Sequence, residues 1–183
     1  MSKVTWKPGT LLAPVPAVMV SCGTMEKPNI ITIAWTGIVN SDPAMTYISV
    51  RRERFSHALI SKSGEFVINL TTSALSRATD LCGVKSGRDT DKFALANLTP
   101  EPASKLSCPM IVQSPLSLEC KVTQVLPLGS HDMFLAKIIS VNVEESLLDE
   151  KGKLHLSRCG LLSYAHGEYF AQGRRLGGFG YSV

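Results

Sequence analysis

The sequence lacks the segments that mark membrane and secreted proteins. Its longest apolar stretch, Leu11 to Cys22, contains Pro14 and Pro16 and is shorter than the ~20 residues that a membrane helix needs. The N-terminus has no basic region that leads into an unbroken apolar segment with a small-residue cleavage site. We therefore expect a cytoplasmic protein without a membrane span.

Patterned cysteines and clustered charges are also missing. The five cysteines are odd in number and scattered, without a Cys-x-x-Cys pair or a Cys/His ligand spacing, which argues against a disulfide scaffold and a metal site. No run of five or six like charges suggests a nucleic-acid-binding arm. The mild excess that remains, a net charge of +4, fits a small anionic ligand instead.

The residues that are present predict one mainly β domain over residues 1–183. At 44% hydrophobic and 19% charged, the composition is that of a folded globular protein. β-branched residues concentrate in short segments bounded by Gly, Pro, Asn and Asp. The predicted strands are Val18–Ser21, Ile30–Trp35, Thr46–Val50, Glu65–Leu70, Ser117–Leu126 and Met133–Val143. Such closely spaced strands favour a closed or nearly closed antiparallel β-barrel, because closure removes exposed edges.

Only a few short helices are expected. The clearest follows Thr46–Val50, with Ser56 as its N-cap and Gly64 as its end. A second is predicted over Ser73–Cys82 with Gly83 as its stop, and a third near Thr90. Crossover helices are too few for a doubly wound sheet, which argues against a Rossmann nucleotide site.

The segment Val50-Arg51-Arg52-Glu53-Arg54-Phe55-Ser56-His57 is the most informative one, because a strand ends in arginines just before a helix begins. Arginine forks and the N–H groups at a helix N-terminus both bind phosphate oxygens. The segment is therefore either a phosphate pocket or a solvated surface patch, and its local chemistry does not decide between the two.

Two further segments carry polar groups or glycine. In Ile30–Gly37, Thr32 and Thr36 interrupt a strand and Gly37 permits close backbone approach, although an ordinary strand with a buried tryptophan would look the same. Cys82–Phe93 is a glycine-rich turn with basic residues, which taken singly is an exposed loop and lacks the Walker A spacing. Only the order of these segments along the chain makes them informative.

That order resembles the flavin reductase-like FMN-binding split barrels, a group that includes flavoredoxins and the small reductase components of two-component monooxygenases. The resemblance covers nearly the whole chain. It rests on Pro14–Val18, Asn29–Gly37 with Ser41-Asp42-Pro43, Gly64–Leu70, Cys82-Gly83, Ser86-Gly87, Asp91-Lys92-Phe93, Leu118-Glu119-Cys120 and Gly129-Ser130-His131. It implies a Greek-key split barrel that acts as a homodimer.

The resemblance also implies an FMN site. The flavin ring is expected over Thr32–Thr36, and the phosphate beside Arg51, Ser56 and His57. The full set of implied FMN-binding residues is Asn29, Thr32, Ile33, Ala34, Trp35, Thr36, Ser49, Val50, Arg51, Ser56, His57, Asn69, Leu70, Cys82, Gly83, Ser86, Lys92 and Phe93.

Three functional hypotheses follow. The first is an NAD(P)H:FMN oxidoreductase in which His131, at a hairpin tip, orients the electron donor, or else is a solvent-exposed bystander. The second is a flavoredoxin-like carrier that holds FMN tightly and exchanges electrons with a redox partner protein or a ferric complex, whereas a monooxygenase component would be the partner of a reductase. The third is a cofactor-free β-barrel interaction module. A redox role for Cys82 is disfavoured, since a helix C-terminus raises the pKa of a thiol.

Overall fold

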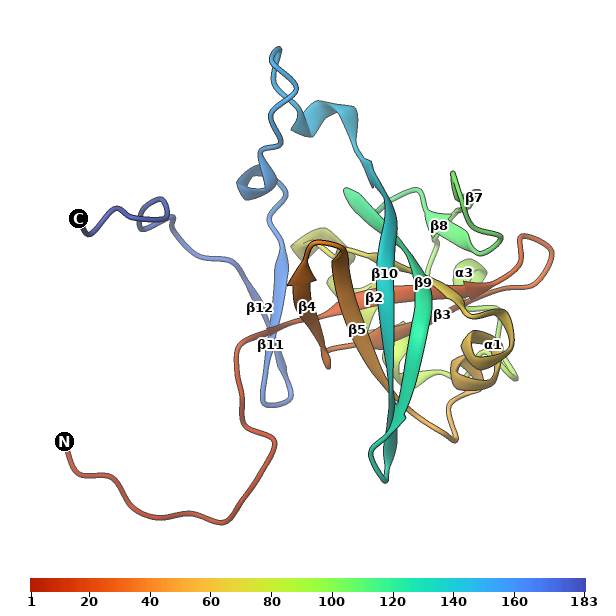
Figure 1. The fold of residues 1–183 in the computed structure, drawn as a ribbon, viewed down its shortest axis with the longest axis horizontal. Helices are drawn as coiled ribbons and strands as arrows, with labels where there is room; N and C mark the ends of the chain where they lie inside the picture. Colours follow the sequence, from red (N-terminus) through yellow and green to blue (C-terminus); the bar gives the residue numbers. More distant parts are fainter.

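Seven antiparallel strands form one curved sheet in the computed structural model, which describes residues 1–183 (Figure 1). Their order across the sheet is β3-β2-β6-β9-β10-β5-β4, so neighbours in space are not always neighbours in sequence. The strands are β2 (Val18–Gly23), β3 (Pro28–Ile33), β4 (Thr36–Ser41), β5 (Ala44–Arg51), β6 (Glu65–Asn69), β9 (Leu116–Pro127) and β10 (His131–Val143). All six predicted strands lie within or across these elements, and β9 and β10 pair as the predicted hairpin.

The two edges of this sheet are connected in sequence but do not pair with each other, which leaves a split barrel. Edge strands β3 and β4 are consecutive in the chain, with only Ala34 and Trp35 between them. The N–H of Ser49 in β5 donates to the carbonyl of Trp35 at 2.9 Å, which extends the β4–β5 pairing back to Trp35. The sheet therefore curls almost closed, and the opening lies beside residues 34 and 35.

The barrel interior holds the main hydrophobic core. Alternate residues of the strands point inward, as the period of two requires. Phe66, Phe134 and Ile48 are fully buried at its centre. Burial of each such side chain contributes about 1.5–3 kcal/mol of favourable transfer free energy, so the barrel wall is a firm support for the residues at its opening.

Helix α1 (Phe55–Ser63) ends as predicted but begins differently. Gly64 closes it in the left-handed conformation, with φ of 68°. The prediction that Ser56 caps the N-terminus is wrong, because the cap position is Arg54 and no side chain bonds there. Ser56 lies inside the first turn, buried, and its hydroxyl accepts a hydrogen bond from Nδ2 of Asn29 at 2.7 Å.

Helix α2 (Ser76–Val84) follows a 3₁₀ turn at Ser73–Leu75 and packs on β3. The prediction that Gly83 stops it is wrong, since the helix runs through Gly83. A Cβ at that position would lie 3.3 Å from the Cβ of Thr32, so the glycine lets helix and strand approach closely. Helix α3 (Lys92–Leu95) begins near the predicted place, capped by the side chain of Asp91.

Two smaller sheets and the chain ends complete the fold (Figure 1). The first small sheet has the order β1-β11-β12 and the second pairs β7 with β8. Their strands are β1 (Val15–Pro16), β11 (Leu162–Ala165), β12 (Glu168–Ala171), β7 (Pro100–Pro102) and β8 (Pro109–Ile111), and further 3₁₀ turns lie at Glu145–Leu147 and Leu156–Arg158. No helix has the length and apolar character needed to span a membrane.

Candidate functional site

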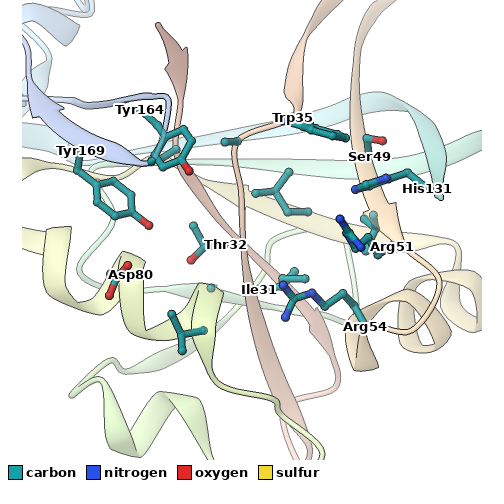
Figure 2. Close-up of a pocket in the computed structure, with 17 residues that line it drawn as sticks. Ile31, Thr32, Trp35, Ser49, Arg51, Arg54, Asp80, His131, Tyr164 and Tyr169 are labelled. Carbon is teal, nitrogen blue, oxygen red and sulfur yellow. The ribbon is translucent and has the colours of Figure 1, made fainter. Parts of the chain in front are cut away.

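A cleft of about 470 Å³ lies at the opening of the barrel (Figure 2). Its walls come from the end of β3 with the following residues 34 and 35, the end of β5, helix α2 and the β11–β12 hairpin. This volume falls within the range of roughly 300–1,000 Å³ that small-molecule sites occupy. The cleft is thus a ligand-sized hollow formed by elements from both halves of the chain.

Aromatic rings line one side of the cleft. The ring of Trp35 is 43% exposed and lies 4.5 Å from the ring of His131, measured between centroids. Burial lowers the pKa of His131, and the nearby Arg51 lowers it further. A mostly neutral imidazole at neutral pH therefore sits beside a flat indole at the mouth of the cleft.

A second hollow of about 340 Å³ continues the first. The two share Ile31, Arg51 and Arg54, and we refer to them together as the groove. The second hollow is the cationic end of the groove. It is lined by Arg51, Arg54, Lys85 and Lys92 against a single carboxylate, that of Glu53.

Lys92 fixes the shape of the cationic end. Its side chain is buried, and its Nζ donates to the carbonyls of Cys82 at 3.0 Å and Lys85 at 3.2 Å. These carbonyls lie at the C-terminus of α2, where a cation is favourable. Burial lowers the pKa of Lys92. An ammonium group has three donors, so one is left for a ligand.

Arg52 and His57 face a different partner. The guanidinium of Arg52 donates twice to Oδ1 of Asp132, at 2.9 and 2.8 Å, and Nε2 of His57 lies 2.9 Å from Oδ2 of the same carboxylate. These hydrogen bonds from Arg52 and His57 lower the pKa of Asp132. The three arginines are therefore not equivalent, because Arg51 and Arg54 line the groove and Arg52 does not.

The comparison with known proteins agrees with this geometry. Residues 11–173 match the flavin reductase like domain. The chain belongs to the flavin reductase-like family. Flavoredoxin of Desulfovibrio vulgaris (Miyazaki F) is 30% identical, with TM-score 0.91 and 100% of both chains covered. Flavoredoxin from Methanosarcina acetivorans is 25% identical, with TM-score 0.91 over 100% of this chain and 97% of that one.

A third solved structure shows the same fold at lower identity. Nitrilotriacetate monooxygenase component B from Bacillus cereus is 20% identical, with TM-score 0.86 over 97% of this chain and 99% of that chain. The predicted family and the mainly β split barrel are thereby confirmed. Membership of the flavin reductase-like family supports a flavin cofactor and an oxidoreductase role.

The groove of this flavin reductase-like protein brings together most of the residues predicted to bind FMN. They come from β3 and the residues after it, the end of β5, the first turn of α1, and α2 with the loop that follows. The residues in the groove are Thr32, Ile33, Ala34, Trp35, Ser49, Val50, Arg51, Ser56, Cys82, Gly83, Ser86 and Lys92, with His131 at its mouth. Their roles as ligands stay predictions.

Six predicted residues do not line the groove, namely Asn29, Thr36, His57, Asn69, Leu70 and Phe93. Thr36 donates to the carbonyl of Tyr47 at 2.6 Å, and Phe93 and Leu70 pack in or against core clusters. The buried amide of Asn69 donates to the Met19 carbonyl and accepts from the Ile111 N–H and the Ser117 hydroxyl. Asn29 lies directly beneath the groove, bonded to Ser56.

The sequence reasoning missed several groove residues. Arg54 and Lys85 lie in the arginine segment and the glycine-rich turn described above, so their positive charge could have indicated that they line the site. Asp80, Tyr164 and Tyr169 were not assigned to the site, and the two tyrosines reach it only through the β11–β12 hairpin. No local pattern places that hairpin across from β3.

Cys82 lies at the cationic end as a thiol. Burial raises the pKa of Cys82 to about 11, and the charge of Lys92 offsets this only in part. A thiolate is the reactive form, so Cys82 is unreactive at neutral pH. This agrees with the expectation that Cys82 has no redox role.

Proposed function

We propose that the groove binds FMN, with the phosphate at the cationic end and the flavin ring against residues 32–35. The observation that carries this proposal is the grouping of four cationic side chains with one carboxylate at one end of a groove whose other end is aromatic. Bound FMN supplies the two-electron chemistry. The chain then needs to bind the cofactor, orient it and admit a second reactant.

The cationic end has free donors for a phosphate dianion. Arg54 and Lys85 form no ion pair, and Arg51 has only a 3.4 Å contact with the exposed Glu53. Helix α1 adds the partial positive charge of its N-terminus, where no side chain caps the N–H groups. These donors favour a dianion over a neutral ligand.

The opposite part of the groove has free backbone groups for a planar ring. Ala34 lies between β3 and β4, and no protein group bonds to its N–H or its carbonyl. Backbone polar groups that line a cleft are normally satisfied, by the chain, water or a ligand. They fit the polar edge of an isoalloxazine ring.

We further propose that the protein is an NAD(P)H:FMN oxidoreductase that passes electrons on to an acceptor. The mostly neutral His131 beside Trp35 lies where it could orient a nicotinamide at the mouth of the groove. The second candidate is a flavoredoxin-like carrier that depends on a protein partner. The match to two flavoredoxins over the whole chain favours it.

A cytoplasmic homodimer is part of the proposal. Leu135 of β10 pairs with Tyr47 of β5, while the adjacent Phe134 and Ile48 are fully buried in the core. Because neighbouring strand residues face opposite sides, Leu135 and Tyr47 lie on the outer face of the barrel. A second copy would bury this apolar face. Light scattering should give the mass of two chains, and Leu135→Glu should give one.

The first experiment is a visible spectrum with added FMN, followed by anaerobic titration with NADH and NADPH. Flavin bands at one FMN per chain that bleach with either nucleotide would support the oxidoreductase. Bound flavin that neither nucleotide reduces would favour the partner-dependent carrier. Absence of FMN binding would contradict the proposal.

A further inference from the structure

Two serine hydroxyls line the cationic end of the groove, those of Ser56 and Ser86. A hydroxyl can both donate and accept a hydrogen bond, so its residue type does not say which it offers to a ligand. Here both oxygens already accept from the chain. Nδ2 of Asn29 donates to Oγ of Ser56 at 2.7 Å, and the N–H of Arg88 donates to Oγ of Ser86 at 3.2 Å. The hydroxyl protons are therefore the groups left for a ligand.

Ser56 is the more constrained of the two serines. It is only 2% exposed, whereas Ser86 lies in an exposed loop. The atom that competes for its proton is the sulfur of Cys22. Burial raises the pKa of the Cys22 thiol, and contacts with Asn29 and Ser56 offset this in part. A neutral thiol is a weak acceptor, so it competes poorly with a phosphate oxygen for the Ser56 proton.

The amide of Asn29 is held in one orientation. Asn29 is buried in β3, directly opposite Cys22 of β2. Its Nδ2 donates both to Ser56 and, at 3.5 Å, to the sulfur of Cys22. Its Oδ1 lies against Gly87, where a Cβ would come within 1.8 Å of it. Asn29 therefore presents a donor, and not an acceptor, to the Ser56 hydroxyl.

We propose that Asn29 is a positioning residue that fixes Ser56 as a donor and thereby makes the cationic end selective for a fully deprotonated phosphate. A dianionic phosphate offers acceptors only, whereas a monoanion carries an O–H that needs an acceptor. The one carboxylate at this end, Glu53, is 66% exposed and contacts Arg51. A protonated phosphate oxygen therefore finds no acceptor in the buried part of the hollow.

This inference rests on the proposed function, since it concerns the phosphate that FMN would place there. The titratable and charged groups around that phosphate come from several elements. They are Arg51, Glu53 and Arg54 at the end of β5 and after it, Cys82 and Lys85 at the end of α2, Lys92 of α3 and Cys22 of β2, with His131 of β10 near Arg51. Hydrogen bonds to the charged form of a group, and nearby opposite charges, favour that form. The bound phosphate should thus stay dianionic to lower pH than a free one.

Phosphorus NMR measures that ionisation at the phosphate itself, apart from the titration of His131. In the FMN-loaded protein the phosphate should titrate below about pH 5, compared with about pH 6 for a free phosphate monoester. Ser56→Ala and Asn29→Leu should each move the midpoint back toward pH 6, because the fixed donor is lost. A wild-type midpoint at or above about pH 6 would contradict the selectivity, whatever the variants do.

The ratio of FMN to riboflavin affinity separates positioning from a general loss of structure, because riboflavin lacks the phosphate. Fluorescence quenching should show that Ser56→Ala lowers this ratio by about tenfold and Asn29→Leu by about fivefold. In the Ser56→Ala background, Asn29→Leu should lower it by less than about twofold, since Asn29 acts through Ser56. The same loss in both backgrounds would contradict the positioning role. If Asn29→Leu does not fold, Asn29→Asp gives the same comparison with the side-chain shape retained.

Ser61→Ala is the matched control, since Ser61 is an exposed serine of the same helix that does not line the groove. It should leave both the midpoint and the ratio unchanged. If FMN binds but neither quantity responds to Asn29, this inference fails and the proposed function stands. If FMN does not bind, the proposed function fails, and phosphorus NMR with inorganic phosphate tests the hollow instead. Phosphate binding that Ser56→Ala and Asn29→Leu weaken would support the inference, and no binding would contradict it.

Discussion

Two polar regions of this molecule differ in how far the chain itself satisfies them. Glu119 of β9 is fully buried, and its carboxylate accepts from the N–H groups of Ser104, Lys105 and Leu106, from the Ser104 hydroxyl and from the Asn142 amide. At the cationic end of the groove, Arg54 and Lys85 form no ion pair and Lys92 keeps one donor free.

This contrast separates structural from ligand-binding polar groups. A buried carboxylate with five donors has no capacity left, so its role is to hold the loop before β8 against β9 and β10. Burial raises the pKa of Glu119, but the hydrogen bonds outweigh it and keep the pKa below its usual range. Donors that converge on a cleft without partners point instead to a ligand.

The largest effect is expected at Glu119. Glu119→Gln places an amide N–H₂ against backbone donors and should lower the free energy of unfolding by about 3 kcal/mol, because buried donors lose their acceptor. Urea denaturation measures this change. Glu101→Gln, on β7, where the carboxylate is half-buried and forms no ion pair or side-chain hydrogen bond, should change it by less than about 0.5 kcal/mol. FMN affinity of the folded Glu119→Gln protein should stay at the wild-type value, and a large loss would contradict the separation of the two regions.

Arg54 and Arg52 give a matched pair for the cationic end. Arg54→Gln should weaken FMN binding by roughly 10- to 100-fold, since a charge-assisted hydrogen bond contributes about 1.5–3 kcal/mol. Arg52 is committed to Asp132, so Arg52→Gln should change FMN affinity by less than about threefold. Fluorescence titration measures both. Equal losses would mean that general surface charge, and not the groove, attracts the flavin.

Gly87 lies in the loop that lines the cationic end of the groove. A Cβ there would lie 1.8 Å from Oδ1 of Asn29 and 3.2 Å from the ring of Phe55, so an alanine must push the loop outward. That loop carries Lys85 and Ser86 into the groove. Gly87→Ala should therefore weaken FMN binding by about tenfold. Gly173→Ala, with nothing within 4 Å of its Cβ, is the control and should have no effect.

The structural features that were best predicted from the sequence are those that depend on a local pattern of residues. Strand positions follow from β-branched runs, and Gly64 ends α1 because the left-handed conformation there favours glycine. The start of the same helix was misplaced because Ser56 looks like a cap locally. Its hydroxyl is instead taken by Asn29, which is 27 residues away in the sequence.

The site was predictable only where its residues share a segment. The arginine segment was identified from the sequence. Its pattern did not show that Arg52 and His57 bind Asp132 of β10, a residue far away in the sequence, and so do not line the groove. Asp80 and the tyrosines reach the groove only after α2 and the β11–β12 hairpin have packed across from β3. Such tertiary pairings leave no periodic signal in the sequence.

The smallest predicted effect is on the pKa of His131, which lines the groove near Arg51. Its pKa lies below 6.5 because of burial first and the charge of Arg51 second. Since the folded state binds this proton less readily than the unfolded state, the protein should lose stability as the pH falls from 6.5 toward the folded pKa. An NMR titration of the imidazole Cε1–H measures the pKa directly.

Arg51→Gln should raise the pKa of His131 toward 6.5, because one of the two causes that lower this pKa is removed. Arg52→Gln should leave it unchanged, since Arg52 is paired with Asp132 and does not act on His131. Added FMN should act in the same direction as Arg51→Gln if its phosphate lies beside Arg51 and offsets that charge. A pKa that FMN leaves unmoved in the wild type would place the phosphate away from Arg51.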